Sequence, residues 1–260
     1  MSSTNGFVRR VSSIQSSFWI ILAFDILAIT LAVSRALLRQ KSPMRYFEET
    51  GIMSFFSGLQ LLIIAGLSLR ISFIRQQIKT RFKSWKSPQN LWRIMAIGFV
   101  FLAADEIFEI HENIDKLIHQ GLRITETALT DRIDDLIIVS YSLIGGYILY
   151  SFWQEFKRYQ PAFCLFIVGF VLKAAMVIFD LYTNNEMILS SWITDPQVHE
   201  LVYDSLRTVE ESLKILAEGA FIAAFCACLN LAKQITRTQW VGTLTSQSNP
   251  YRSSKVTRRL

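Results

Sequence analysis

The chain of 260 residues contains 51% hydrophobic and only 18% charged residues, and its net charge is +6. A soluble domain carries about 25% charged residues, and the deficit here falls in several long apolar runs. These numbers exclude an ordinary soluble domain, a disordered chain and a disulfide scaffold. Because the basic residues flank the apolar runs, the positive charge indicates a lipid bilayer as partner rather than nucleic acid.

The sequence predicts six membrane-spanning helices, since a helix needs about 20 apolar residues to cross about 30 Å of hydrocarbon. In chain order the predicted spans are Phe18–Leu38, Gly51–Leu69, Leu91–Ile110, Leu136–Trp153, Ala162–Leu181 and Leu213–Leu231. We therefore expect an all-α, polytopic bundle of residues 1–235, followed by a disordered basic tail over residues 236–260. The last helical pattern begins at Asp195-Pro196, so this helix should extend beyond the outer surface.

Lys and Arg beside the spans predict the orientation, because cytoplasmic segments of membrane proteins carry an excess of positive side chains. The N-terminal segment, the second and fourth loops and the C-terminal tail are basic, and their one acid is Glu155. Taken together, the other three loops hold more acids than Lys and Arg. Both termini are therefore expected on the cytoplasmic side of the plasma membrane, and an even number of spans agrees with that.

Ionisable side chains recur inside the predicted spans, where they are costly and usually face the bundle interior. Their spacing places them on a shared face of each helix. These faces hold Asp105, Glu109 and Glu112 on the third helix, Asp131 and Asp135 on the fourth, Lys173 and Asp180 on the fifth, and Asp204, Arg207, Glu211, Lys214 and Glu218 on the last. Four helices are therefore expected to direct charges toward one another.

A rise of 1.5 Å per residue brings these acids to about one level, in the outer third of the bilayer. Asp105 and Glu218 lie deepest, at about 21 Å and 22 Å from the cytoplasmic ends of their helices. Lys214, as ion-pair partner, and Lys173 compensate two charges, and the surplus acids must be protonated or bound to a cation. The sequence therefore predicts an acidic cation site, for a metal ion or for protons, formed by the third to sixth spans.

The candidate metal ligands are acids of this cluster and one histidine. They are Asp105, Glu109, His111, Glu112, Asp180, Glu211 and Glu218. Oxygen ligands alone would favour Ca²⁺, Mg²⁺ or Mn²⁺ as the divalent cofactor, whereas His111, His119 and His199 would form an open zinc site if the outer loops folded over the bundle. The alternative is a set of solvated ion pairs at the outer interface. Glu106 and Glu210 lie off the shared faces and are expected to be solvated.

Three further features of the spans favour structural roles. Asp25 stands alone in the first span, where it is expected to meet a polar neighbour. Gly219, Ala223 and Ala227 recur every four residues on the last span, and this stripe of small residues predicts the close approach of another helix. The three cysteines all fall inside spans and are expected to pack as small residues.

Three functions from different classes fit these features. The first is a proton- or ion-coupled carrier of a small molecule, lipid or ion. The second is a metal-dependent membrane hydrolase that acts on lipid or peptide with a carboxylate as general base. The third is a scaffold whose acidic outer loops recruit a basic partner. Uninterrupted spans count against the first, the absence of a catalytic motif counts against the second, and the third does not explain Asp105 and Glu218.

Residues 210–214, with the sequence Glu-Glu-Ser-Leu-Lys, resemble the Glu-Glu-x-x-Lys motif of the PrsW-type membrane proteases. In those proteases the paired acids carry catalysis. The resemblance covers five residues, and no downstream motif of that family follows. The sequence alone therefore identifies no family.

Overall fold

The computed structural model describes residues 2–48, 51–77, 87–122, 133–183, 193 and 195–247. Within these ranges the chain is helical and forms no strand, which confirms the predicted all-α class. The helices are α1 (Ser2–Leu38), η1 (Pro43–Tyr46), α2 (Ile52–Gln76), α3 (Pro88–Phe108), α4 (Ile110–Leu122), α5 (Ile133–Ser151), α6 (Trp153–Phe156), η3 (Lys157–Ala162), α7 (Phe163–Thr183) and α9 (Pro196–Gln247).

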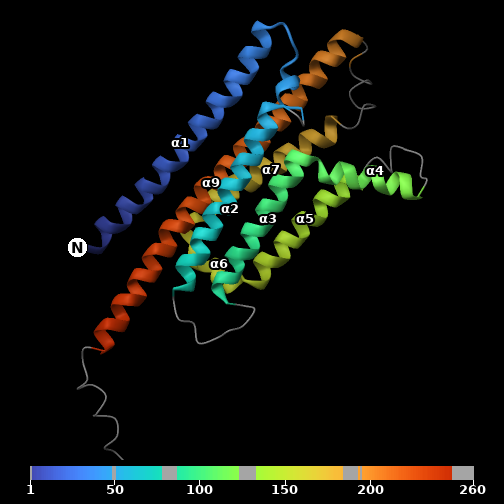
Figure 1. Cartoon of the computed structure of the whole chain (residues 1–260). Helices are drawn as coiled ribbons and strands as arrows, with labels where there is room; N and C mark the ends of the chain where they lie inside the picture. The colour runs from blue at the N-terminus through green and yellow to red at the C-terminus, as the bar shows by residue number, and fades with distance from the viewer. Residues whose placement is uncertain are drawn as a thin grey trace, which may run out of the picture.

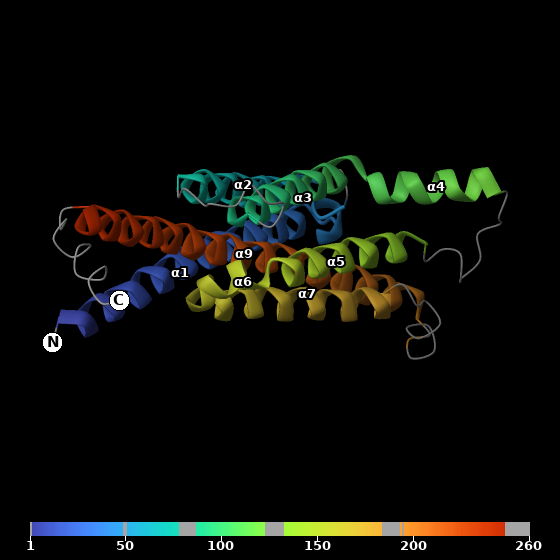
Figure 2. The ribbon, with the colours of Figure 1, turned by 90° about the horizontal axis from the view of Figure 1, so that it is seen from below.

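The long helices form an elongated bundle around α9 (Figure 1, Figure 2). α9 contacts α1, α2 and α7, and α2 packs along α3. α1, α2 and α3 run in alternating directions, and the start of α1 and the end of α9 lie at the same end of the bundle. α4 leaves the opposite end, contacts α5 and α3 near its start, and then projects beyond the bundle. These two ends are called the terminal end and the α4 end below.

α2 buries several polar side chains among its apolar ones and exposes large apolar side chains. Ser57, Gln60 and Ser68 are buried, whereas Phe55 and Leu59 are exposed. In water this arrangement would forfeit the free energy of burying apolar surface. In hydrocarbon it is favourable, because polar groups must be satisfied inside the protein and apolar groups contact lipid tails.

Among the described residues, four helical segments are long and apolar enough to cross a membrane. They are Ser16–Leu38, Ile52–Gln76, Trp153–Asp180 and Pro196–Thr238. These segments correspond to the first, second, fifth and sixth predicted spans. The third predicted span corresponds to α3, which carries Arg93, Asp105 and Glu106, and the fourth corresponds to α5. Six spans and their orientation stay predictions.

The third helix is interrupted at Glu109, which has left-handed backbone geometry with φ of 52°. α3 therefore ends at Phe108, and α4 begins at Ile110 in a new direction (Figure 1). The prediction that Asp105, Glu109 and Glu112 share a face of one helix is wrong for this reason. A local contact between Asp105 and His111, described below, bridges the break.

The last helix begins at Pro196 as predicted, and the Asp195 side chain accepts the backbone N–H of Gln197 at 2.9 Å as its N-cap. α9 then continues to Gln247. Residues 236–247 are thus helical where the sequence predicts a disordered tail, and no proline lies between Pro196 and Gln247 to end the helix earlier. The remainder of the predicted tail, residues 248–260, lies outside the described residues.

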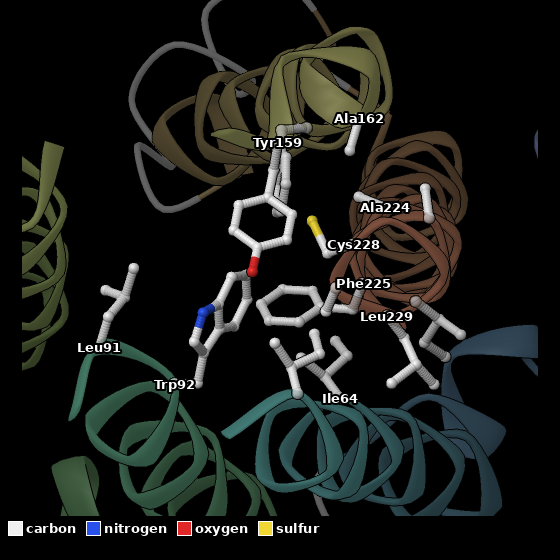
Figure 3. Close-up of a cluster of buried hydrophobic side chains, with 14 of the residues drawn as sticks. Ile64, Leu91, Trp92, Tyr159, Ala162, Ala224, Phe225, Cys228 and Leu229 are labelled. Atoms are coloured by element: carbon white, nitrogen blue, oxygen red, sulfur yellow. The ribbon is translucent and has the colours of Figure 1, made fainter. Parts of the chain in front are cut away.

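An aromatic core lies toward the terminal end, between α2, α3, η3 and α9 (Figure 3). The ring of Trp92 contacts Tyr159 edge to face with centroids 4.8 Å apart, and Phe225 at 6.1 Å. Cys228 lies against the same core as a free, buried thiol, as predicted, whereas Cys226 is only partly buried and Cys164 is exposed. Such edge-to-face contacts between large rings stabilise the meeting of these four elements.

A buried ion pair between α2 and α6 adjoins this core. Arg75 Nε and Nη2 donate to the two carboxylate oxygens of Glu155 at 2.7 and 2.9 Å, and only 3% and 5% of the side chains are exposed. The Tyr159 hydroxyl also donates to Glu155, at 3.3 Å. The one acid of the predicted cytoplasmic segments therefore has a structural role, because it compensates a buried arginine.

Candidate functional site

A network of charged side chains lies among α3, α7 and α9. Lys214 Nζ on α9 contacts Glu106 of α3 at 2.8 Å and Glu211, one turn away, at 2.6 Å. Glu106, Glu211 and Lys214 are all largely buried. The network thus joins the third helix to the last, but it does so through Glu106, which was expected in solvent, and not through the predicted face of Asp105, Glu109 and Glu112.

Two more charged groups belong to this network. Lys173 of α7 lies within electrostatic reach of Glu106, Glu211, Lys214 and Glu218. Glu218 is only 5% exposed, and its Oε1 accepts a hydrogen bond of 3.0 Å from the hydroxyl of Ser57 on α2. We call Glu106, Lys173, Glu211, Lys214 and Glu218 the charge network. It holds three carboxylates and two amines.

Glu218 differs from the other acids of the charge network in its partners. No Lys, Arg or His among the described residues lies within ion-pair distance of Glu218, and its Oε2 has no hydrogen-bond partner among them. Lys214, one turn earlier on α9, is held by Glu106 and Glu211. Glu218 therefore makes no direct ion pair among the described residues, although Lys173 lies within its electrostatic reach.

A second buried carboxylate lies between α1, α2 and α9. Asp25 is 1% exposed, and its Oδ1 accepts a hydrogen bond of 2.7 Å from the Gln60 side chain. Its Oδ2 has no hydrogen-bond partner among the described residues and lies directly against Gly219. The polar neighbour predicted for Asp25 is Gln60, and the close approach of a helix predicted at Gly219 is made by α1 through the same Asp25 side chain.

Asp105 anchors the break between α3 and α4. Its Oδ1 accepts the backbone N–H of His111 at 2.8 Å, and its Oδ2 lies 3.1 Å from His111 Nδ1. A carboxylate at the start of α4 also suits the positive end of that helix dipole. Asp105 is buried, as its predicted depth required, and it holds His111 rather than a second acid.

The remaining predicted site residues lie apart from the charge network or make other contacts. Glu112 pairs with Lys116 at 3.1 Å on the exposed side of α4. Asp180 lies within electrostatic reach of Glu210, and Glu210 accepts a hydrogen bond of 3.2 Å from Thr183. Glu109 forms the turn after α3. Asp131 and the side chain of Asp135 lie outside the described residues.

The predicted metal cluster is not found in the described part of the chain. No three His, Cys, Asp or Glu side chains there converge in an arrangement that could hold a metal ion. This also applies to His111, His119 and His199. The physical reason is that lysine and histidine partners occupy the acids: Lys214 holds Glu106 and Glu211, and His111 contacts Asp105.

Sequence reasoning placed two residues wrongly. Glu106 and Glu210 were expected in solvent but are largely buried. It also did not bring Asp25 near the other acids, whereas Asp25 lies beside Gly219, the residue that follows Glu218. Polar residues inside the otherwise apolar α2, Ser57 and Gln60, were the signal that buried carboxylates needed partners there.

Replacing Lys214 by Met is expected to lower the free energy of unfolding by roughly 2 kcal/mol, because Glu106 and Glu211 would lose their shared cation in a weakly solvated site. Denaturation of the purified protein in mixed micelles measures this change. Lys214→Arg keeps the charge and should lose less. Equal stability of the Met variant and the parent would contradict the role given to Lys214.

The fold and the site define an all-helical protein with four segments able to span a membrane and a buried charge network among its helices. The chain belongs to a family described as a domain of unknown function, DUF8692, which matches residues 12–229. No curated protein matches the chain, and no solved structure does.

Proposed function

We propose that this chain is a six-span integral membrane protein that binds a proton at Glu218, within the charge network, as part of a proton-coupled process. The observation that carries the proposal is the imbalance of this network. Three carboxylates face two amines, and Lys214 is already shared by Glu106 and Glu211. A charge inside a membrane is costly unless it is paired, so a proton on Glu218 is the simplest compensation.

The contacts of Glu218 support a proton rather than a metal ion. One oxygen accepts the Ser57 hydroxyl, and the other has no hydrogen-bond partner among the described residues. A metal ion needs several ligand oxygens around one point, whereas a proton needs only one oxygen. The nearest oxygens of Glu106 and Glu211 are directed at Lys214.

The proposal includes the topology with both termini in the cytoplasm. The two helical termini share one end of the bundle, and the end of α2 with Arg75 and the start of α3 with Arg93 lie toward the same end (Figure 1). The α4 end, which lies beyond the charge network, would then face the outside. α3 and α5 complete the six spans in this proposal, since the two acids of α3, Glu106 and Asp105, are directed at α9 and at the α4 junction rather than at lipid.

Infrared difference spectroscopy of the protein in liposomes tests the proton on Glu218. Exchange of H₂O for D₂O shifts the C=O stretching band of a protonated carboxyl group, so the parent should show such a band at neutral pH. Glu218→Gln should remove part of this band. Glu112→Gln removes an acid from the exposed side of α4 and is the matched control.

The proton proposal fails if the Glu218→Gln spectrum equals that of the parent, because Glu218 would then be ionised. A second measurement uses a pH-sensitive dye inside the liposomes. Proton movement that follows an imposed gradient in the parent, and that Glu218→Gln abolishes while Glu112→Gln preserves, would extend the proposal from binding to transport.

A further inference from the structure

α4 exposes an apolar stripe that no described helix covers. Leu117 is 67% exposed and Ile114 is 37% exposed, and Phe108, just before the α4 turn, is 68% exposed. The other side of α4 is polar. There Glu112 and Lys116 form an ion pair of 3.1 Å, and His119 is buried beside Asp115. α4 is therefore amphipathic, and Ile114 and Leu117 are its uncovered apolar side chains.

The direction of α4 is held by the buried contact at its first turn. The Asp105 carboxylate accepts the His111 backbone N–H and contacts its ring, and Glu109 supplies the left-handed turn. Both views of the ribbon show α4 running away from the bundle (Figure 1, Figure 2). A helix fixed in this way keeps its apolar stripe in a defined place relative to the bundle.

The depth of the turn places α4 at the edge of the hydrocarbon layer. Leu91–Phe108 covers about 27 Å at 1.5 Å per residue, which is close to the thickness of about 30 Å. The outward apolar surface of α3, with Ile97, Phe101 and Phe108, ends at this turn, and the α4 stripe begins there. The apolar surface that α3 would present to lipid therefore continues onto α4.

We infer that α4 is an interfacial helix whose apolar stripe, Ile114 and Leu117, contacts the acyl chains of the outer leaflet. Amphipathic helices bind at this boundary by burying apolar side chains to a shallow depth. The polar side chains of α4 carry acids as well as Lys116, so zwitterionic lipid should suffice and anionic lipid should add little. The inference does not depend on a proton at Glu218.

Spin labelling in liposomes of zwitterionic phosphatidylcholine tests this contact. The three native cysteines, Cys164, Cys226 and Cys228, are first replaced by Ala, and a nitroxide is attached at Leu117→Cys or at Lys116→Cys. The label at position 117 should collide mainly with oxygen, which concentrates in lipid, and the label at 116 with a water-soluble nickel complex. The adjacent positions are matched because both side chains are exposed.

Two results would overturn the inference. Equal access of the nickel complex to positions 116 and 117 would place the stripe in water. If neither oxygen nor the nickel complex reaches the label at position 117, and the spectrum is broadened by dipolar coupling between labels on two chains, the partner of the stripe is a second copy of the chain. Ile114→Cys repeats the measurement one turn earlier, so that a misfolded Leu117 variant does not decide the outcome.

Discussion

Glu155→Gln is expected to lower the free energy of unfolding by about 3–5 kcal/mol, because it leaves the buried Arg75 guanidinium without a counter-charge. The carboxylate accepts two hydrogen bonds from Arg75 and one from Tyr159, so the amide would also lose part of this bonding. Denaturation of the purified protein in mixed micelles, followed by circular dichroism, measures the change.

Two controls separate the loss of a buried pair from the loss of any pair. Glu112→Gln removes one partner of the exposed Glu112–Lys116 pair and should cost about 0.5 kcal/mol or less. The double replacement Arg75→Met with Glu155→Leu removes both buried charges and should recover most of the stability. A Glu155→Gln protein as stable as the Glu112→Gln control would show that Arg75 finds other compensation.

Gly219→Ala is expected to destabilise the protein by about 2 kcal/mol and to separate α1 from α9. A Cβ atom at this position would overlap the Asp25 carboxylate and approach Ile21 at 3.3 Å, so α1 would have to move. The intrinsic preference of helices for Ala over Gly works in the opposite direction by about 1 kcal/mol. Thermal unfolding in detergent measures the net effect.

Gly66→Ala is the matched control, because nothing lies within 4 Å of a Cβ atom built at Gly66 on α2. This variant should be as stable as the parent or slightly more stable. Asp25→Ala combined with Gly219→Ala removes the overlapping carboxylate and should restore the approach of α1. A Gly219→Ala protein that behaves like the Gly66→Ala protein would mean that α1 does not pack closely on α9.

Local features of the sequence predicted the helices well where the pattern was strong. The start of α9 followed from Asp195-Pro196, and the close approach at Gly219 followed from the small stripe. The break at Glu109 could not be predicted in this way. Its left-handed backbone is stabilised by Asp105 through the N–H of His111, a contact that no helical period encodes.

The composition and the helical spacing of the residues by themselves determined that this chain is helical, rich in apolar segments and charged on selected helix faces. Each segment shows these properties independently, because apolar length and the 3.6-residue turn are local features of the sequence. Only the tertiary structure decided which charges meet. Lys214 could have paired with several acids on its own helix, and its pairing with Glu106 depends on how α3 lies beside α9. Asp25 reached Gly219 for the same reason, since the level of one helix against another is set by packing across the bundle rather than by either sequence segment.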